Sequence, residues 1–421
     1  MTIALTKIAL TGVAGASPTL MPNAKTEIVR HTQYSQATLC DGEWIEVTTT
    51  VPFGPLAGHS TTFDELRGVT VILKSDGETW ELQNGNWQLI TSGGPPRVAN
   101  ASCWNSTLQK VIVFGGESAS GKLNDLWSWD GTTWEQLDNG LGNAPSPRSY
   151  TTLVHDTARN VYVVCGGYDT ALRGDTWEWS AEFGWDHVSD GGPDAIYAHN
   201  MVYDAVNART VLHGGYAWGN RDDTWSWDGS TWTSIAPGGP TRYVFSMEYD
   251  SHGERIIAFG GTQCCAEVET TELWELHENT WTSCGTTNSI DGRGYCDWSY
   301  DSLRNCMVIV GGYGQYNGTG GRVPLPDHWE YQMPIIDCNN NGTADFEDVA
   351  TGYSEDANAN NVPDECECFS DVNGDGTGNV LDILMLLENW GQTGPIGDTT
   401  NDGTVNVDDI MYIIDNWGAC D

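Results

Sequence analysis

The chain has 421 residues and is strongly acidic, with 58 Asp and Glu against 18 Lys and Arg and a formal net charge of -40. Because this charge repels a phosphate backbone, we exclude nucleic acid as a partner. No segment approaches the roughly 20 apolar residues with which a helix spans a bilayer, so we expect no membrane span. Twelve cysteines indicate an oxidising compartment.

Residues 1–26 have features of an export leader. Lys7 precedes a short apolar stretch, Ile8 to Ala16, that ends in an Ala-x-Ala-like sequence. The stretch is short for a signal peptide and contains Thr and Gly. Together with the cysteines and the calcium loops described below, it favours a secreted or cell-surface protein, of bacterial type.

A tryptophan-centred phrase then returns six times, at spacings of 47 to 55 residues. Its first tryptophans are Trp80, Trp127, Trp177, Trp225, Trp274 and Trp329. In five copies a second tryptophan follows seven or eight residues later: Trp87, Trp134, Trp185, Trp232 and Trp281. A fixed period near 50 indicates a repeat architecture rather than separate domains.

Each period carries the turn signals of four antiparallel strands. An Asp or Asn ends one apolar run, a basic residue opens the next, and that run ends in Gly-Gly, as in Asp204, Arg209 and Gly214-Gly215. Turn dipeptides such as Asp228-Gly229 separate the later runs. Four strands make one propeller blade, so residues 40–334 are predicted to form a six-bladed β-propeller, a mainly β fold.

The two ends of the array predict how the ring closes. The last repeat reaches Met333-Pro334 without a fourth strand. A matching strand lies near residues 42–48, where the sequence around Trp44 resembles that around Trp134. We predict that this strand completes the last blade, because an open sheet edge would otherwise remain.

The recurring phrase, from Asp204 through Gly-Gly to Trp232, resembles that of the kelch-type propellers of secreted bacterial proteins, over residues 40–334. The first copy departs from it, with Leu73-Lys74-Ser75-Asp76 in place of Gly-Gly. Four arginines recur just before the first strand of a blade: Arg97, Arg148, Arg242 and Arg293. They form either a basic ring at one rim of the channel or pairs within the scaffold, and we favour scaffold pairs.

No catalytic residue is assigned from the sequence, and enzymatic activity is left open with a binding role favoured. The turns at Asp130 and Asp228 resemble the Asp-box of sialidases, but they are one residue shorter, and the Asp-box is itself a structural turn. The periodic tryptophans are assigned to the core. Candidates for stacking on a sugar are Trp218, in the loop from Gly214, and Tyr316, in the loop from Tyr313 to Pro326.

After Pro334 the composition changes, since residues 335–421 hold 19 Asp and Glu and no Lys or Arg. The acids follow the spacing of EF-hand-like, 12-residue calcium loops, in which alternate oxygens surround the cation. The ligands predicted in two complete loops are Asp371, Asn373, Asp375, Thr377 and Asp382, then Asp398, Thr400, Asp402, Thr404 and Asp409. Calcium is therefore the expected cofactor.

Each complete loop is followed by an apolar segment, at 383–387 and 410–414, and no helix precedes it. These two units resemble a dockerin type I domain, over residues 368–421. The resemblance implies a cohesin-like partner or self-assembly. The Ser-Thr pairs of cellulosomal dockerins are absent, because Val380-Leu381 and Val407-Asp408 stand at those positions.

Residues 335–367 contain two further loops with the same spacing and no long apolar segment after them. Their predicted ligands are Asp337, Asn339, Asn341, Thr343 and Asp348, then Asp356, Asn358, Asn360, Val362 and Glu367. They resemble thrombospondin type 3 repeats, in which calcium organises a short stalk. The alternative is a solvated, Asn-rich linker.

The positions of the cysteines predict several disulfides. The bridges expected are Cys296–Cys306, Cys338–Cys366 and Cys368–Cys420, with Cys264 or Cys265 bound to Cys284. Cys40, Cys103 and Cys165 are not assigned.

Two functions fit these observations. The first is a secreted, calcium-binding adhesion or surface-assembly protein, whose propeller binds a glycan or a protein and whose acidic module attaches or multimerises it. The second is a propeller enzyme of polysaccharide catabolism, tethered through its dockerin-like domain. A convergent acid–base set in the channel would separate them.

Overall fold

The computed structural model describes residues 39–263, 268–286, 289–314, 321–334, 343–354, 377–391, 399–400 and 404–419, with the single residues 363, 370 and 372. The described residues divide into two compact units, one within residues 36–351 and one within residues 352–421. No helix among the described residues is long and apolar enough to cross a membrane.

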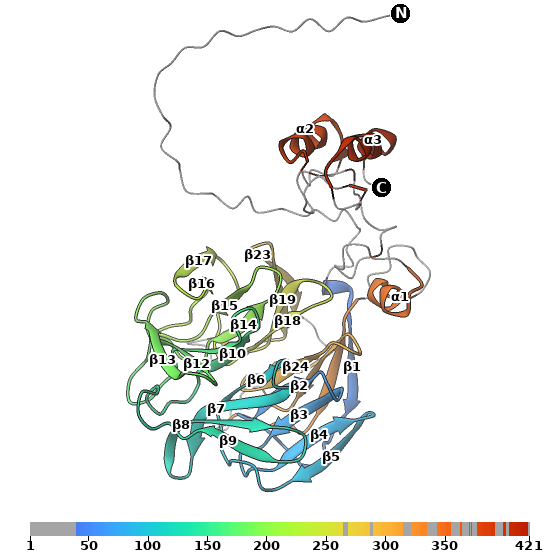
Figure 1. Cartoon of the computed structure of the whole chain (residues 1–421). Helices are drawn as coiled ribbons and strands as arrows, with labels where there is room; N and C mark the ends of the chain where they lie inside the picture. The colour runs from blue at the N-terminus through green and yellow to red at the C-terminus, as the bar shows by residue number, and fades with distance from the viewer. Residues whose placement is uncertain are drawn as a thin grey trace, which may run out of the picture. The chain divides into compact units, whose positions relative to one another are not determined.

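The larger unit is a six-bladed β-propeller, as predicted (Figure 1). Blades one to three are β2 (Ser60–Asp64), β3 (Val69–Leu73), β4 (Thr79–Gln83) and β5 (Asn86–Thr91); β6 (Ala101–Asn105), β7 (Lys110–Ser118), β8 (Gly121–Trp129) and β9 (Trp134–Asp138); β10 (Thr152–Asp156), β11 (Val161–Cys165), β12 (Thr176–Ser180) and β13 (Gly184–Ser189). The first blade is regular although it lacks the Gly-Gly pair.

The remaining blades follow the same antiparallel order. Blade four is β14 (Asn200–Asp204), β15 (Arg209–His213), β16 (Thr224–Trp227) and β17 (Trp232–Ala236), and blade five is β18 (Ser246–Asp250), β19 (Arg255–Phe259), β22 (Glu272–His277) and β23 (Thr280–Thr286). Blade six is β24 (Asp297–Asp301), β25 (Cys306–Val310), β26 (His328–Gln332) and the N-terminal β1 (Glu43–Thr48). A short ribbon of β20 (Thr262–Gln263) and β21 (Val268–Glu269) extends blade five.

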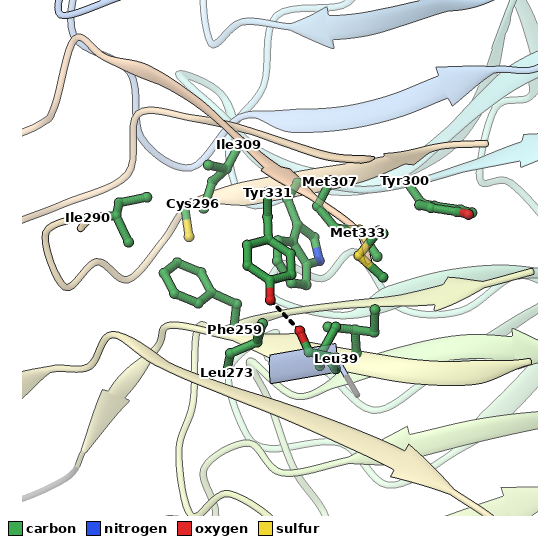
Figure 2. Packing of buried hydrophobic residues seen from close by; sticks show 12 residues of the cluster. Leu39, Phe259, Leu273, Ile290, Cys296, Tyr300, Met307, Ile309, Tyr331 and Met333 are labelled. Carbon is green, nitrogen blue, oxygen red and sulfur yellow. Dashed lines mark hydrogen bonds between the residues drawn. The ribbon is translucent and has the colours of Figure 1, made fainter. Parts of the chain in front are cut away.

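Strand β1 closes the ring at the predicted place. It pairs antiparallel with β26, with Trp44 opposite Tyr331 and Glu46 opposite Trp329. The Trp44 ring lies 4.7 Å from that of Phe259 in blade five and 4.9 Å from that of Tyr331, between centroids. Figure 2 shows the Tyr331 hydroxyl donating to the carbonyl oxygen of buried Leu39, in the 3-10 turn η1 (Leu39–Asp41).

A disulfide joins Cys40 to Cys284 of β23, so the N-terminal segment is bound covalently to blade five. Cys284 was expected to pair with Cys264 or Cys265, and this is wrong. The predicted Cys296–Cys306 bridge is also wrong, because both are free thiols. The hairpin turn lies between Asp301 and Cys306, which face each other, whereas Cys296 precedes the first strand. Cys338, Cys366, Cys368 and Cys420 lie outside the described residues.

The four recurring arginines are scaffold residues, as favoured from the sequence, and do not form a basic rim. All four are buried: Arg97, Arg148, Arg242 and Arg293. Each donates a hydrogen bond of 2.7–2.9 Å to the first carbonyl of a Gly-Gly pair and forms an ion pair with a carboxylate. That carboxylate also accepts a hydrogen bond from the first tryptophan of the blade phrase.

Blades one and four replace the arginine and supply another cation. Leu56 and Ile196 occupy the arginine position. Their carbonyl oxygens accept hydrogen bonds from the N–H of Gly312 and of Gly167, as the carbonyl oxygen of Arg148 does from Gly116. There the carboxylate pairs with a cation of its own blade instead, Lys74 with Glu78 and Arg221 with Asp223. Every blade therefore keeps a positively charged partner for this half-buried carboxylate.

We expect Arg293→Met to destabilise the propeller by about 3–5 kcal/mol, because Asp327 would lose its buried partner. Lys110→Met is the control, since Lys110 pairs with exposed Glu135 and should contribute less than about 1 kcal/mol. Denaturant unfolding monitored by tryptophan fluorescence measures both. Equal effects of the two substitutions would contradict a structural role for the buried pair.

The smaller unit contains α2 (Val380–Glu388), α3 (Val407–Asp415) and the short strands β27 (Thr377–Gly378) and β28 (Gly418–Ala419). Strand β28 pairs with β27, so the chain returns to the first complete loop. The described core of this unit is small, with Leu386, Val405 and Ile413 fully buried. A seven-residue helix, α1 (Asp345–Thr351), belongs to the larger unit and lies in the segment predicted as a stalk.

Candidate functional site

A closed ring of backbone hydrogen bonds defines one end of the propeller channel. The residue two positions before each innermost strand has a left-handed conformation, with φ of 49° to 69°: Gly58, Ala99, Tyr150, Ala198, Val244 and Tyr295. The N–H of each donates a bond of 2.9–3.0 Å to the carbonyl of its counterpart in the neighbouring blade. We call this end the ring end, and the opposite end, where hairpin turns join the first two strands of each blade, the hairpin end.

Seven tyrosines gather at the ring end: Tyr150, Tyr168, Tyr197, Tyr216, Tyr243, Tyr295 and Tyr313. Their ring centroids form six contacts of 5.5–6.2 Å. Tyr150 and Tyr295 come from blades three and six, which are opposite in the ring, so their 6.2 Å contact crosses the channel mouth. Burial raises the pKa of both phenols, which therefore remain protonated hydrogen-bond donors.

Two cations and one further aromatic residue border this tyrosine face. The Lys122 ammonium lies 4.8 Å from the ring centroid of Tyr168, and the Arg322 guanidinium lies 5.7 Å from that of Tyr295. Trp218 is 92 % exposed. It lies at the tip of a loop closed by a bridge between Tyr216 and Asn220. Tyr316, the other aromatic residue predicted to contact a ligand, lies outside the described residues.

Trp218 is a predicted ligand contact, whereas the tyrosine face is not predicted from the sequence. A signal was present, because Tyr168, Tyr216 and Tyr313 each follow a Gly-Gly pair directly. That repeated Gly-Gly-Tyr places three phenols at the ring end of three blades. The other four tyrosines follow no Gly-Gly pair: Tyr150 and Tyr295 stand at the left-handed position of the ring, and Tyr197 and Tyr243 stand one position before it. The phenols of all seven meet only when the ring closes.

A second group of candidate side chains lines the channel below the ring. Glu248 of β18 and Asp297 of β24 both face a cavity of about 420 Å³. No repeated pattern indicates these two carboxylates, because the equivalent positions in the other blades are not acidic. Glu248, for example, corresponds to Val154 and Val202.

Few of the predicted calcium ligands can be placed. The described ones are Thr343, Asp348, Thr377, Asp382, Thr400, Thr404 and Asp409. Outside the described residues lie Asp337, Asn339, Asn341, Asp356, Asn358, Asn360, Val362, Glu367, Asp371, Asn373, Asp375, Asp398 and Asp402. Within the part of the chain that the structure describes, no group of three or more His, Cys, Asp or Glu is arranged to hold a metal.

The closing aspartates of the two complete loops occupy equivalent places. Asp382 and Asp409 are buried, and each accepts a hydrogen bond of 2.7–2.8 Å from the N–H of the Asn that caps the following helix. Thr400 also donates from its N–H to Asp409, at 2.9 Å. Although burial opposes ionisation, the hydrogen bonds from Asn406 and Thr400 lower the pKa of Asp409. Both carboxylates are therefore fixed at the end of their loops.

Comparison with known proteins supports the fold and nothing finer. No protein-family model matches the chain. The solved structure titled "Structure of YjhT" matches with a TM-score of 0.52 and 16 % identity, over 67 % of this chain and 96 % of that one. At this identity the similarity shows the shared architecture alone. The chain thus contains a six-bladed β-propeller similar in fold to YjhT, followed by small helical pieces.

Proposed function

We propose that the chain is a secreted, calcium-binding adhesion or surface-assembly protein whose propeller binds a glycan at the tyrosine face. The observation that carries this proposal is the set of seven tyrosines beside the exposed Trp218. Aromatic faces pack against the C–H faces of pyranose rings, while phenol hydroxyls bind sugar hydroxyls. Trp218 and Tyr168 are exposed and the other six tyrosines are half-buried, so part of their aromatic surface is open to a ligand.

The acidic module is proposed to attach or multimerise the protein. Two sets of apolar side chains are exposed on its helices, Val380, Leu384 and Leu387 on α2 and Val407, Met411 and Ile414 on α3. The sets occupy equivalent positions, 27 residues apart. Duplicated apolar faces on an acidic module are suited to a cohesin-like partner or to a second copy of the module.

Calcium binding and export belong to the same proposal. The module has no Lys or Arg to pair with its acids, and the fixed carboxylates of Asp382 and Asp409 lie where calcium loops close. Oxidising compartments permit disulfides such as Cys40–Cys284. These features support a calcium-dependent protein of the cell surface or its surroundings.

We expect Trp218→Ala to weaken glycan binding by at least tenfold, because the exposed indole is the largest stacking surface beside the tyrosine face. The glycan is first selected by array binding of the full chain and then titrated by calorimetry. Phe183→Ala is the matched control, since Phe183 is 80 % exposed but follows β12 at the hairpin end. If both variants bound like the wild type, or both lost binding equally, the tyrosine face would not be the glycan site.

The alternative function is a polysaccharide-active propeller enzyme tethered through its dockerin-like module. Glu248 and Asp297 favour it, because a pair of carboxylates can provide acid and base. A hydrolase screen run on the glycans selected above separates the two functions. Turnover that is lost in Glu248→Gln and kept in Trp218→Ala would establish the enzyme and exclude a purely adhesive role.

A further inference from the structure

The channel contains a cavity that the proposed glycan site does not use. It extends from Tyr150 and Tyr295 at the ring end to the hairpin end. Ser106, Thr157 and Ala205 line it at the hairpin end and are exposed, so this end of the cavity meets solvent. The tyrosine pair covers the other end.

Two carboxylates from neighbouring blades face this cavity. Asp297 Oδ2 accepts a 2.8 Å hydrogen bond from the N–H of Thr61 in blade one. Burial raises the pKa of Asp297 to about 7. Burial, together with the charge of Asp297, raises the pKa of Glu248 well above its ordinary range. Near neutral pH, burial of these two carboxyl groups therefore requires either that they bind a proton or that a negative charge stays in the cavity without a partner.

No positive charge of the protein lies among the residues that line this cavity. They include no Lys or Arg. Burial lowers the pKa of His59 to about 3 and that of His199 to about 4, so both imidazoles are neutral. The other titratable groups around the carboxylates are Glu65, His155, the thiols of Cys103 and Cys296, and phenols, none of which is cationic at neutral pH.

Buried polar atoms in the same lining also lack partners among the described residues. Both ring nitrogens of His59, which is 5 % exposed, accept or donate no hydrogen bond. The same holds for Thr61 Oγ1 and His199 Nδ1. Leaving a buried donor or acceptor unsatisfied costs about 1–3 kcal/mol. These atoms and the two carboxylates therefore form a site that lacks its hydrogen-bonding and charge partners until a polar, positively charged ligand binds.

We propose that the cavity binds a small organic cation, whose primary ammonium group is held by Glu248 and Asp297. An ammonium has three N–H donors, which match the two carboxylates and one of the unpartnered acceptors, His59 or Thr61. The volume of about 420 Å³ lies within the range of small-molecule sites and accommodates a single amino sugar. A metal ion fits less well, because no metal-binding group of residues occurs in the described part of the chain.

The test uses glucosamine as the probe and glucose, which has a hydroxyl in place of the ammonium, as the matched neutral ligand. Calorimetry is done on the full chain with calcium present throughout. Glucosamine should bind at least tenfold more tightly than glucose. Glu248→Gln and Asp297→Asn should each weaken it at least tenfold, whereas Asp186→Asn, an exposed carboxylate on β13, should not.

A second readout follows from the protonation of the carboxyl groups. Because a bound ammonium favours their ionised form, binding should release protons to the buffer. The observed heat should then change with the ionisation enthalpy of the buffer for glucosamine and not for glucose. Both amide variants should reduce this proton release.

Several results would overturn the proposal. Equal affinity for glucose and glucosamine would exclude an ammonium site, as would unchanged glucosamine binding in both variants. Competitive displacement of glucosamine from the wild type by added calcium would make the cavity a metal site. If either variant failed to fold, the comparison of the two sugars on the wild type would decide. Trp218→Ala should leave glucosamine binding unchanged, which separates this site from the glycan site.

Discussion

Chelation of calcium is expected to unfold the C-terminal module and to leave the propeller folded. Four filled loops would bring eight positive charges to a segment with 19 acidic and no basic residues, and would remove much of its self-repulsion. Its core is too small to oppose that repulsion alone, since Leu386, Val405 and Ile413 are the fully buried apolar residues described there. Metal binding should therefore be coupled to folding.

Calorimetry of the full chain measures this effect. Two unfolding transitions are expected with calcium and one, that of the propeller, with a chelator. Asp371→Ala and Asp398→Ala should each weaken one of the tighter sites, because the complete loops offer more carboxylates than the Asn-rich loops of residues 335–367. A calorimetric unfolding profile that did not change with calcium would show that the acids of this segment do not form calcium loops.

Deletion of residues 1–50 is expected to lower the melting temperature of the propeller by more than about 10 °C. The deletion removes β1, the packing of Trp44 and the Cys40–Cys284 bridge, and it exposes the edge of β26. In the chain-entropy model a disulfide spanning about 240 residues contributes about 5 kcal/mol alone. For a domain of this size each kcal/mol shifts the melting temperature by about 2–4 °C.

The double variant Cys40→Ser with Cys284→Ser separates the two contributions. It keeps β1 and should lose only the part due to the disulfide. A reducing agent should destabilise the propeller of the wild type to the same extent and should leave the propeller transition of the deletion variant unchanged. Melting of the deletion variant at the wild-type temperature would show that β1 is dispensable.

The fold could be predicted because its signals are periodic. The first tryptophan of each blade phrase and the Gly-Gly pairs recur in fixed order, and the strand missing after Trp329 is supplied by the segment around Trp44, as their pairing confirms. Disulfides could not be predicted with the same success. Symmetry about Asp301 implied a Cys296–Cys306 bridge, but the turn is centred farther along the chain, so Asp301 itself faces Cys306.

The candidate sites were less predictable for a different reason. Trp218 stood out because it breaks the period of the core tryptophans. Glu248, Asp297 and most of the tyrosines come from separate blades, and only closure of the ring brings them together. The free-energy cost of burying a carboxylate depends on the surroundings that the fold creates. These surroundings cannot be predicted from a local pattern of residues.

The direction of β26 has a mechanical consequence. Its last residue, Gln332, lies opposite Glu43, the first residue of β1, and the N–H of Met333 bonds to Asn305 in a hairpin turn. The chain therefore leaves the propeller at the hairpin end, whereas the tyrosine face lies at the ring end. If a glycan held the ring end while a load acted on Pro334, the force would run along β26. The hydrogen bonds of β26 to β25 and β1 would then have to shear together instead of unzipping singly.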